Sequence, residues 1–164
     1  MRTIWFYGGE KEEVLTSVAE IVGEALINRN KNVEIIVHSE IQDILGLGLK
    51  NTPEDRATFT DRLGFLGNLL HRNDVFVLMI SKDAFLDDRK QVKENYGSYI
   101  QATFGKNDPL TDIAIDPEAD IATGAKKIVE YLIKKTLIPE QCQEVYSEEE
   151  EEEIRKRLED LGYV

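Results

Sequence analysis

Hydrophobic positions along the chain form two patterns, short continuous runs and longer stripes with helical spacing. The runs have the length and the β-branched or aromatic content of buried strands, and they cover residues 3–7, 33–37, 75–80, 99–104 and 113–115. The stripes cover residues 11–28, a segment that begins at Pro53, residues 85–96 and residues 119–137. Strands that alternate with helices predict a parallel sheet with right-handed crossovers and helices on both faces.

Two of the predicted helices have a defined apolar face. The second begins with a hydroxyl N-cap at Thr52, a proline in the first position and acidic residues in the first turn, which is a strong helix start. Its predicted buried stripe is Phe59, Leu63, Leu66 and Leu70. For the helix at residues 11–28 the predicted buried positions are Val14, Val18, Ile21 and Ala25.

The segments that follow residues 3–7, 33–37 and 75–80 are predicted to open onto one edge of the sheet. In open α/β sheets, ligands bind at the carboxyl ends of the strands. Candidate functional residues are therefore expected in these three segments.

The end of the chain has a different composition. Residues 1–138 are predicted to form the domain, and residues 139–164 an acidic linker and a C-terminal helix. Six consecutive glutamates at 148–153 follow Ser147, which fits a capping box with Glu150. Ile154, Leu158 and Leu161 form a narrow apolar stripe. This helix either docks on the domain or presents its stripe to a partner chain.

Composition narrows the function classes. The 164 residues suit one domain, and the 41% of apolar residues can fill its core. Thirty-two Asp and Glu against 20 Lys and Arg give a net charge of −12, which disfavours nucleic acid and membrane as partners. The chain lacks an apolar run long enough for a membrane span or a signal peptide, which predicts a cytoplasmic protein.

The chain shows no pattern for a metal or a cofactor. The lone Cys142 excludes an internal disulfide and a multi-cysteine zinc site. His38 and His71 are too few and too far apart for a metal site. No cofactor is predicted.

A glycine turn between the first strand and the first helix is where a phosphate-binding loop would lie. Such a loop needs backbone N–H donors, a lysine on the β- and γ-phosphates and an adjacent hydroxyl for magnesium. In the two possible registers counted from Gly8 and Gly9, the lysine position holds Val14 or Leu15. The turn carries three glutamates instead, so it is interpreted as a degenerate phosphate loop.

The chain resembles adenylylsulfate kinases, P-loop enzymes that phosphorylate the 3′-hydroxyl of adenosine 5′-phosphosulfate. The matching stretches are residues 3–8 with T-I-W-F-T-G, 47–56 with L-G-F-S-x-E-D-R, 62–70 with R-I-G-x-V-A-x-L-L, 75–81 with the strand before I-S-P, and 112–116 and 127–132 with the last strand and helix. The resemblance covers about residues 2–135, and residues 47–70 are its most specific part. It implies a P-loop-kinase-like three-layer α/β sandwich with a mainly parallel sheet, here followed by a C-terminal helical tail.

The resemblance also implies that much of the active site has changed. Val37 and Ser39 replace the two aspartates of V-E-V-L-D-G-D, and Gln42 replaces an arginine that contacts the phosphosulfate. Leu49 replaces the phenylalanine that packs on the adenine, and Lys82 replaces the proline of I-S-P. A short stretch at residues 105–110 stands where the family has a long lid.

Three substrate-side positions of the family persist, namely Arg56, Arg62 and Ser81. By resemblance, Arg56 and Ser81 contact the sulfonucleotide and Arg62 belongs to a basic pair beside it. The alternative role for Arg56 is an ion pair with Glu54 or Asp55 in the same turn.

The resulting hypothesis is a catalytically inactive adenylylsulfate-kinase-like protein that senses a sulfonucleotide or binds a partner in sulfate activation. Its predicted ligand is adenosine phosphosulfate or the 3′-phosphorylated form, and a homodimer or a partner protein is a further expectation. The alternatives are a structural or oligomerisation module without a nucleotide ligand, and a residual nucleotide-dependent transferase, for which the sequence offers no nucleophile–base pair.

Overall fold

Five parallel strands form one sheet in the order β2–β3–β1–β4–β5. The computed structural model describes residues 2–81, 84–97, 99–140 and 156. The elements along the chain are β1 (Thr3–Gly8), α1 (Glu12–Ile27), β2 (Asn32–Val37), α2 (His38–Leu45), α3 (Pro53–His71), β3 (Val75–Ile80), α4 (Leu86–Tyr96), β4 (Ile100–Phe104), β5 (Ile113–Ile115) and α5 (Ile121–Lys134). The predicted α/β class with a parallel sheet is confirmed.

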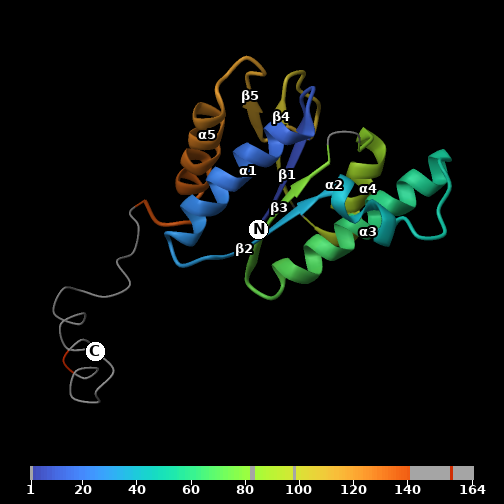
Figure 1. Cartoon of the computed structure of the whole chain (residues 1–164), viewed down its shortest axis with the longest axis horizontal. Helices are drawn as coiled ribbons and strands as arrows, with labels where there is room; N and C mark the ends of the chain where they lie inside the picture. Colours follow the sequence, from blue (N-terminus) through green and yellow to red (C-terminus); the bar gives the residue numbers. More distant parts are fainter. Residues whose placement is uncertain (1, 82–83, 98, 141–155, 157–164) are drawn as a thin grey trace.

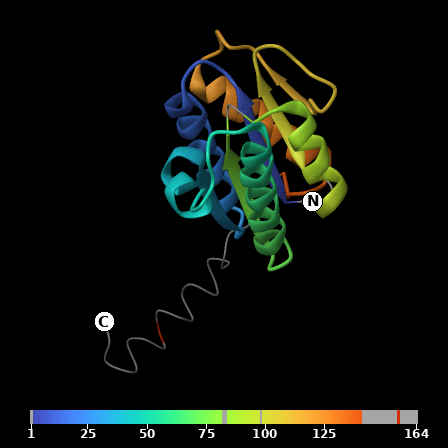
Figure 2. The ribbon, with the colours of Figure 1, turned by 90° about the vertical axis from the view of Figure 1, so that its right-hand side faces the viewer.

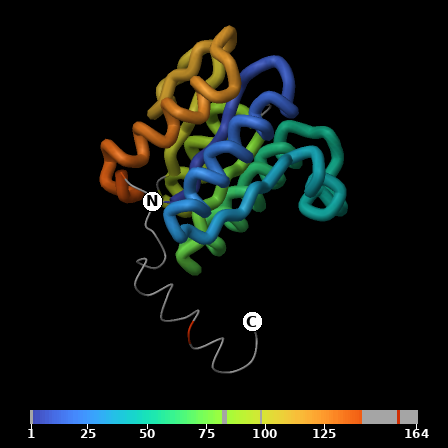
Figure 3. The backbone as a smooth tube through the Cα atoms, turned by 60° about the vertical axis from the view of Figure 1, so that its left-hand side comes forward, coloured from blue at the N-terminus to red at the C-terminus, as the bar shows by residue number. Residues whose placement is uncertain are grey.

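Helices cover both faces of the sheet, with α1 and α5 on one face and α3 and α4 on the other (Figure 1). The side chains of a strand alternate between the two faces. On β1, Ile4 and Phe6 pack into the core beneath α1 and α5, whereas Trp5 packs into the core beneath α3 and α4. Figure 2 shows α2 and α3 on one side of the sheet, and Figure 3 shows α1 and α5 side by side on the other.

The strands and helices predicted between residues 3 and 137 are all present within a few residues of their expected bounds, but α2 was not predicted. This helix has eight residues, most of them exposed, and Ile41 and Leu45 pack against the core beneath α3 and α4. A segment this short is below the roughly 11–18 residues over which helical spacing is read, so it was not assigned as a helix. It occupies the segment directly after β2.

The predicted buried face of α1 is wrong at two positions. Val14 and Ile21 are exposed, and the buried face consists of Leu15, Val18, Ala19, Val22, Gly23 and Leu26. The helix is apolar on more than one side, and packing against the sheet and α5 selects the wider face. On α3, Phe59 and Leu63 are buried as predicted, while Leu66 and Leu70 are partly buried against the same core.

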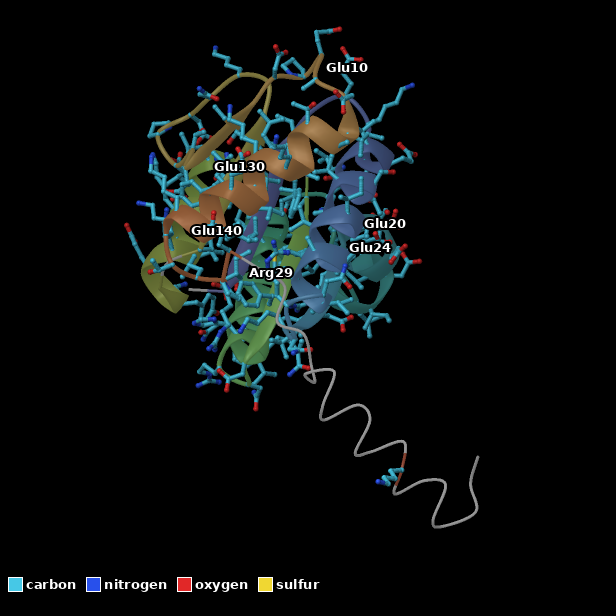
Figure 4. All side chains as sticks on the ribbon, turned by 90° about the vertical axis from the view of Figure 1, so that its left-hand side faces the viewer. Glu10, Glu20, Glu24, Arg29, Glu130 and Glu140 are labelled. Atoms are coloured by element: carbon cyan, nitrogen blue, oxygen red, sulfur yellow. The ribbon has the colours of Figure 1, made fainter. Side chains whose placement is uncertain are left out.

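The chain leaves α5 along the end of α1. Arg29 donates hydrogen bonds to the carbonyl oxygens of Pro139 at 3.0 Å and Glu140 at 3.2 Å (Figure 4). The predicted acidic linker and C-terminal helix lie outside the described residues, except for residues 139, 140 and 156. Within the described part of the chain, none of the helices has the length and hydropathy to span a membrane.

Candidate functional site

The turn after β1 lies in close contact with the end of β4. Gly8 and Gly9 have φ angles of +82° and +75°, and a Cβ on Gly8 would lie 2.6 Å from the carbonyl oxygen of Phe104. The N–H of Gly9 donates to that same oxygen at 2.8 Å. Glycine is therefore required at position 8, and the Gly9 donor is used within the sheet.

The first turn of α1 presents carboxylates at this edge. Only residues 9–11 separate β1 from α1, and Glu12 and Glu13 lie in the first helical turn. The hydroxyl of Ser39 donates a hydrogen bond to the Glu12 carboxylate. Of the two side chains that could occupy the lysine position, Leu15 is fully buried and Val14 points to solvent.

A cavity of about 440 Å³ lies beside this edge, between α2, α3 and residues 84–85. Its lining residues are His38, Gln42, Gly46, Leu49, Lys50, Asn51, Asp55, Arg56, Phe59, Thr60, Ala84 and Phe85. Its volume is within the range of small-molecule sites, about 300–1,000 Å³. It combines apolar and aromatic walls with two cations, Lys50 and Arg56.

Arg56 lies at the mouth of the cavity. Its guanidinium carbon is 4.8 Å from the centroid of the Phe85 ring, a cation–π contact. Asp55 accepts a hydrogen bond from the backbone N–H of Lys50 at 2.9 Å, and the described contacts include no ion pair of Arg56 with Glu54 or Asp55. Burial raises the pKa of the Asp88 carboxyl, although the positive charge of Arg56 acts in the opposite direction.

Arg62 and Ser81 lie behind the wall of the cavity. Arg62 donates to the carbonyl oxygens of Leu45 and Leu47, so it holds the end of α2 against α3. Ser81 is fully buried at the end of β3, and its hydroxyl lies 2.9 Å from Nδ1 of His38. Of the three predicted sulfonucleotide contacts, Arg56 is the one that lines the cavity.

His38 belongs to the site, although the sequence analysis considered it only as a metal ligand. Its ring stacks on Phe59 with a centroid distance of 4.5 Å and an interplanar angle of 29°, and it lines the cavity. Its position directly after a strand of the predicted ligand edge was the signal that could have identified it.

Sequence reasoning also missed a buried polar cluster around Arg89. This side chain is fully buried and donates to Asp108 at 2.8 Å, to the side chain of Gln101 and to the Ala84 carbonyl at 3.1 Å. Its guanidinium lies 3.6 Å from the centroid of the Tyr7 ring. The cluster fixes the β4–β5 loop, which stands where the resembled family has its lid.

The described residues contain no group of three or more His, Cys, Asp and Glu side chains that could hold a metal ion. The charged side chains that line the cavity are Lys50, Asp55 and Arg56, and its aromatic side chains are His38, Phe59 and Phe85.

Comparison with known proteins gives consistent matches. The family model described as adenylylsulphate kinase matches residues 1–110. The adenylyl-sulfate kinase of Rippkaea orientalis is 29% identical over 177 residues, an alignment that covers 99% of this chain and 93% of the relative. The probable adenylyl-sulfate kinase of Synechocystis sp. is 30% identical over 121 residues, 73% of this chain and 64% of the relative.

Solved structures share the fold. The APS kinase of Mycobacterium tuberculosis in complex with AMPPNP and APS superposes with a TM-score of 0.69 at 17% identity, over 80% of this chain and 96% of that one. The hexameric APS kinase of Thiobacillus denitrificans gives a TM-score of 0.68 at 15% identity, over 81% of this chain and 29% of that one.

Proposed function

The chain belongs to the adenylylsulphate kinase family, and from that premise we propose that it binds a sulfonucleotide without transferring phosphate to it. The ligand we propose is adenosine 5′-phosphosulfate, held in the cavity between α2 and α3. The role that follows is that of a sulfonucleotide-sensing or partner-binding module in sulfate activation.

The loss of phosphoryl transfer is supported by the turn after β1. Catalysis of this reaction depends on positioning and on positive charge around the transferred phosphate. Here the two possible lysine positions hold the exposed Val14 and the buried Leu15, and the Gly9 N–H donates to the carbonyl oxygen of Phe104. Glu12 lies in the first turn of α1, beside the turn where the resembled family binds the phosphates of ATP, and its carboxylate accepts a hydrogen bond from Ser39. These groups do not fit Mg·ATP.

Ligand binding is supported chiefly by Arg56. A guanidinium stacked on the exposed Phe85 ring at a cavity mouth, with Lys50 nearby, provides charge for a phosphate or sulfate group. Leu49 and Phe59 provide apolar surface for a base. Both the cation and the apolar walls are needed for a nucleotide, and this cavity has both.

The expected affinity is weak. By resemblance, the family has an arginine at the position of Gln42 and a phenylalanine at the position of Leu49. In this chain Gln42 and Leu49 line the cavity, but Gln42 has no positive charge and Leu49 has no ring that could stack on a base. Losing one charged contact and one stacking surface leaves a dissociation constant of about 10⁻⁴ M or weaker. ATP is expected to bind still more weakly because of the glutamates in the turn.

Calorimetric titration of the full chain with adenosine 5′-phosphosulfate tests the binding. We expect saturable binding that Arg56→Ala weakens about tenfold or more, since a charged hydrogen-bonding group contributes roughly 1.5–3 kcal/mol. Arg72→Ala is the matched control, because Arg72 is an exposed arginine at the other end of α3. The proposal would be refuted if ATP bound more tightly than the sulfonucleotide. It would also be refuted if Arg56→Ala and Arg72→Ala bound the sulfonucleotide with equal affinity.

A further inference from the structure

The cavity is lined by α2, by the first part of α3 and by the segments next to these helices. All of its described lining residues belong to positions 38–60 and 84–85, and none comes from β1 or α1. The first of these residues along the chain is His38, at the start of α2.

His38 is held in place from two sides. Its ring stacks on Phe59 of α3, and its Nδ1 is 2.9 Å from the hydroxyl of Ser81. Ser81 is itself fixed, because it is fully buried and its N–H donates to the Phe6 carbonyl at 3.2 Å. A ring with two such contacts forms a rigid wall.

The next residue continues this wall toward α1. Ser39 donates to the Glu12 carboxylate, so two consecutive residues connect the end of β3 with the first turn of α1. The resembled family motif has a glycine where this chain has His38. An imidazole therefore fills space that a glycine would leave open.

The two cations line the cavity from other segments than His38 does. Arg56 is in the first turn of α3 and Lys50 precedes the helix, whereas Phe59, which contacts His38, is one turn further along. A bound nucleotide that places one anionic group at Arg56 and Lys50 can direct its other end toward His38, which lines the same cavity. A second anionic group at that end would meet the imidazole ring.

We propose that His38 is a specificity-determining residue, which makes the cavity accept nucleotides with an anionic group at one end of the ribose and exclude those with anionic groups at both ends. The cavity would then accept adenosine 5′-phosphosulfate and reject the 3′-phosphorylated form. This inference rests on the proposed function, because it assumes a nucleotide in the cavity.

The test compares adenosine 5′-monophosphate with adenosine 3′,5′-bisphosphate, each titrated calorimetrically into the full chain. The wild type is expected to bind the monophosphate at least about tenfold more tightly, the size of effect that a steric wall produces in a pocket. His38→Gly is expected to reduce this preference to about threefold or less. His38→Phe restores a ring without the nitrogen atoms and is expected to keep the full preference.

His71→Ala is the matched control, because it removes the other histidine at the far end of α3, and its preference should equal that of the wild type. Thermal unfolding of each variant confirms that it is folded. The inference would be overturned if His38→Gly kept the wild-type preference for the monophosphate. It would also be overturned if His38→Gly bound the bisphosphate more weakly than the wild type, because the histidine would then attract the second phosphate. Both results leave the proposed function standing, whereas no saturable binding of adenosine 5′-phosphosulfate or the monophosphate overturns both.

Discussion

At the residue scale, the two positions that could hold a phosphate-loop lysine have opposite environments. Leu15 is fully buried in the core beneath α1, and Val14 is 42% exposed. A lysine at position 15 would have to bring its ammonium group into an apolar core, whereas one at position 14 would remain in water. The packing of α1 therefore opposes a phosphate loop in the register that places the lysine at position 15.

We predict that Leu15→Lys destabilises the protein by about 3–5 kcal/mol, the cost of an unpaired buried charge together with lost packing. Val14→Lys is expected to change the free energy of unfolding by less than about 1 kcal/mol, as at other exposed sites. Urea unfolding followed by circular dichroism measures both. If the two variants were equally stable, the environment assigned to position 15 would be incorrect.

At the element scale, the β4–β5 loop is held as a fixed connection by one buried arginine. Arg89 of α4 pairs with Asp108 of the loop, and Gln101 of β4 donates to the same carboxylate at 2.9 Å. Burial alone would raise the pKa of Asp108, but hydrogen bonds from Arg89 and the Leu110 N–H outweigh it and hold the pKa below the ordinary 3.8. The loop is thus bound to the sheet rather than free to close over it.

Asp108→Asn is expected to destabilise the protein by about 2–4 kcal/mol, because Arg89 would be left buried without a counter-charge. The control is Asp87→Asn, which removes an exposed carboxylate paired with Lys90 at 3.1 Å and should cost less than about 1 kcal/mol. Thermal unfolding at pH 7 measures the difference. Equal effects would mean that the buried pair contributes no more than a surface pair.

The stabilising effect of Asp108 also depends on pH, with a defined sign. Because its folded pKa lies below 3.8, the contribution is complete above the unfolded pKa and is lost as the pH falls through the folded value. The stability difference between wild type and Asp108→Asn should therefore be constant from pH 7 to about pH 5 and shrink below about pH 4. A difference that grows on acidification would contradict this assignment.

At the scale of the whole molecule, the sequence predicted the sheet because uninterrupted apolar runs such as residues 75–80 determine buried strands. It predicted the start of α3 because Thr52 and Pro53 act locally. The buried side of α1 was decided by tertiary packing, so Val14 and Ile21 were assigned wrongly. Short α2 has Ile41 and Leu45 four residues apart, a pattern too brief to predict a helix. His38 was missed although it directly follows a predicted strand.

The candidate site was predictable only in part. Its place at the carboxyl edge follows from the strand pattern, whereas Arg56, Gln42 and Leu49, which line the cavity, were identified through the family resemblance. Arg62 and Arg89 show the limit, since a sequence does not reveal whether an arginine faces a ligand or binds carbonyls and carboxylates of its own chain. The C-terminal helix, the homodimer and the partner protein stay predictions.

We propose that this family member holds a sulfonucleotide without phosphorylating it. The most direct measurement is an assay of phosphoryl transfer, in which the full chain is incubated with Mg·ATP and adenosine 5′-phosphosulfate and the 3′-phosphorylated product is separated by chromatography. We expect the product to form at the rate of a protein-free control at every protein concentration. Product that increases in proportion to the protein concentration would contradict it.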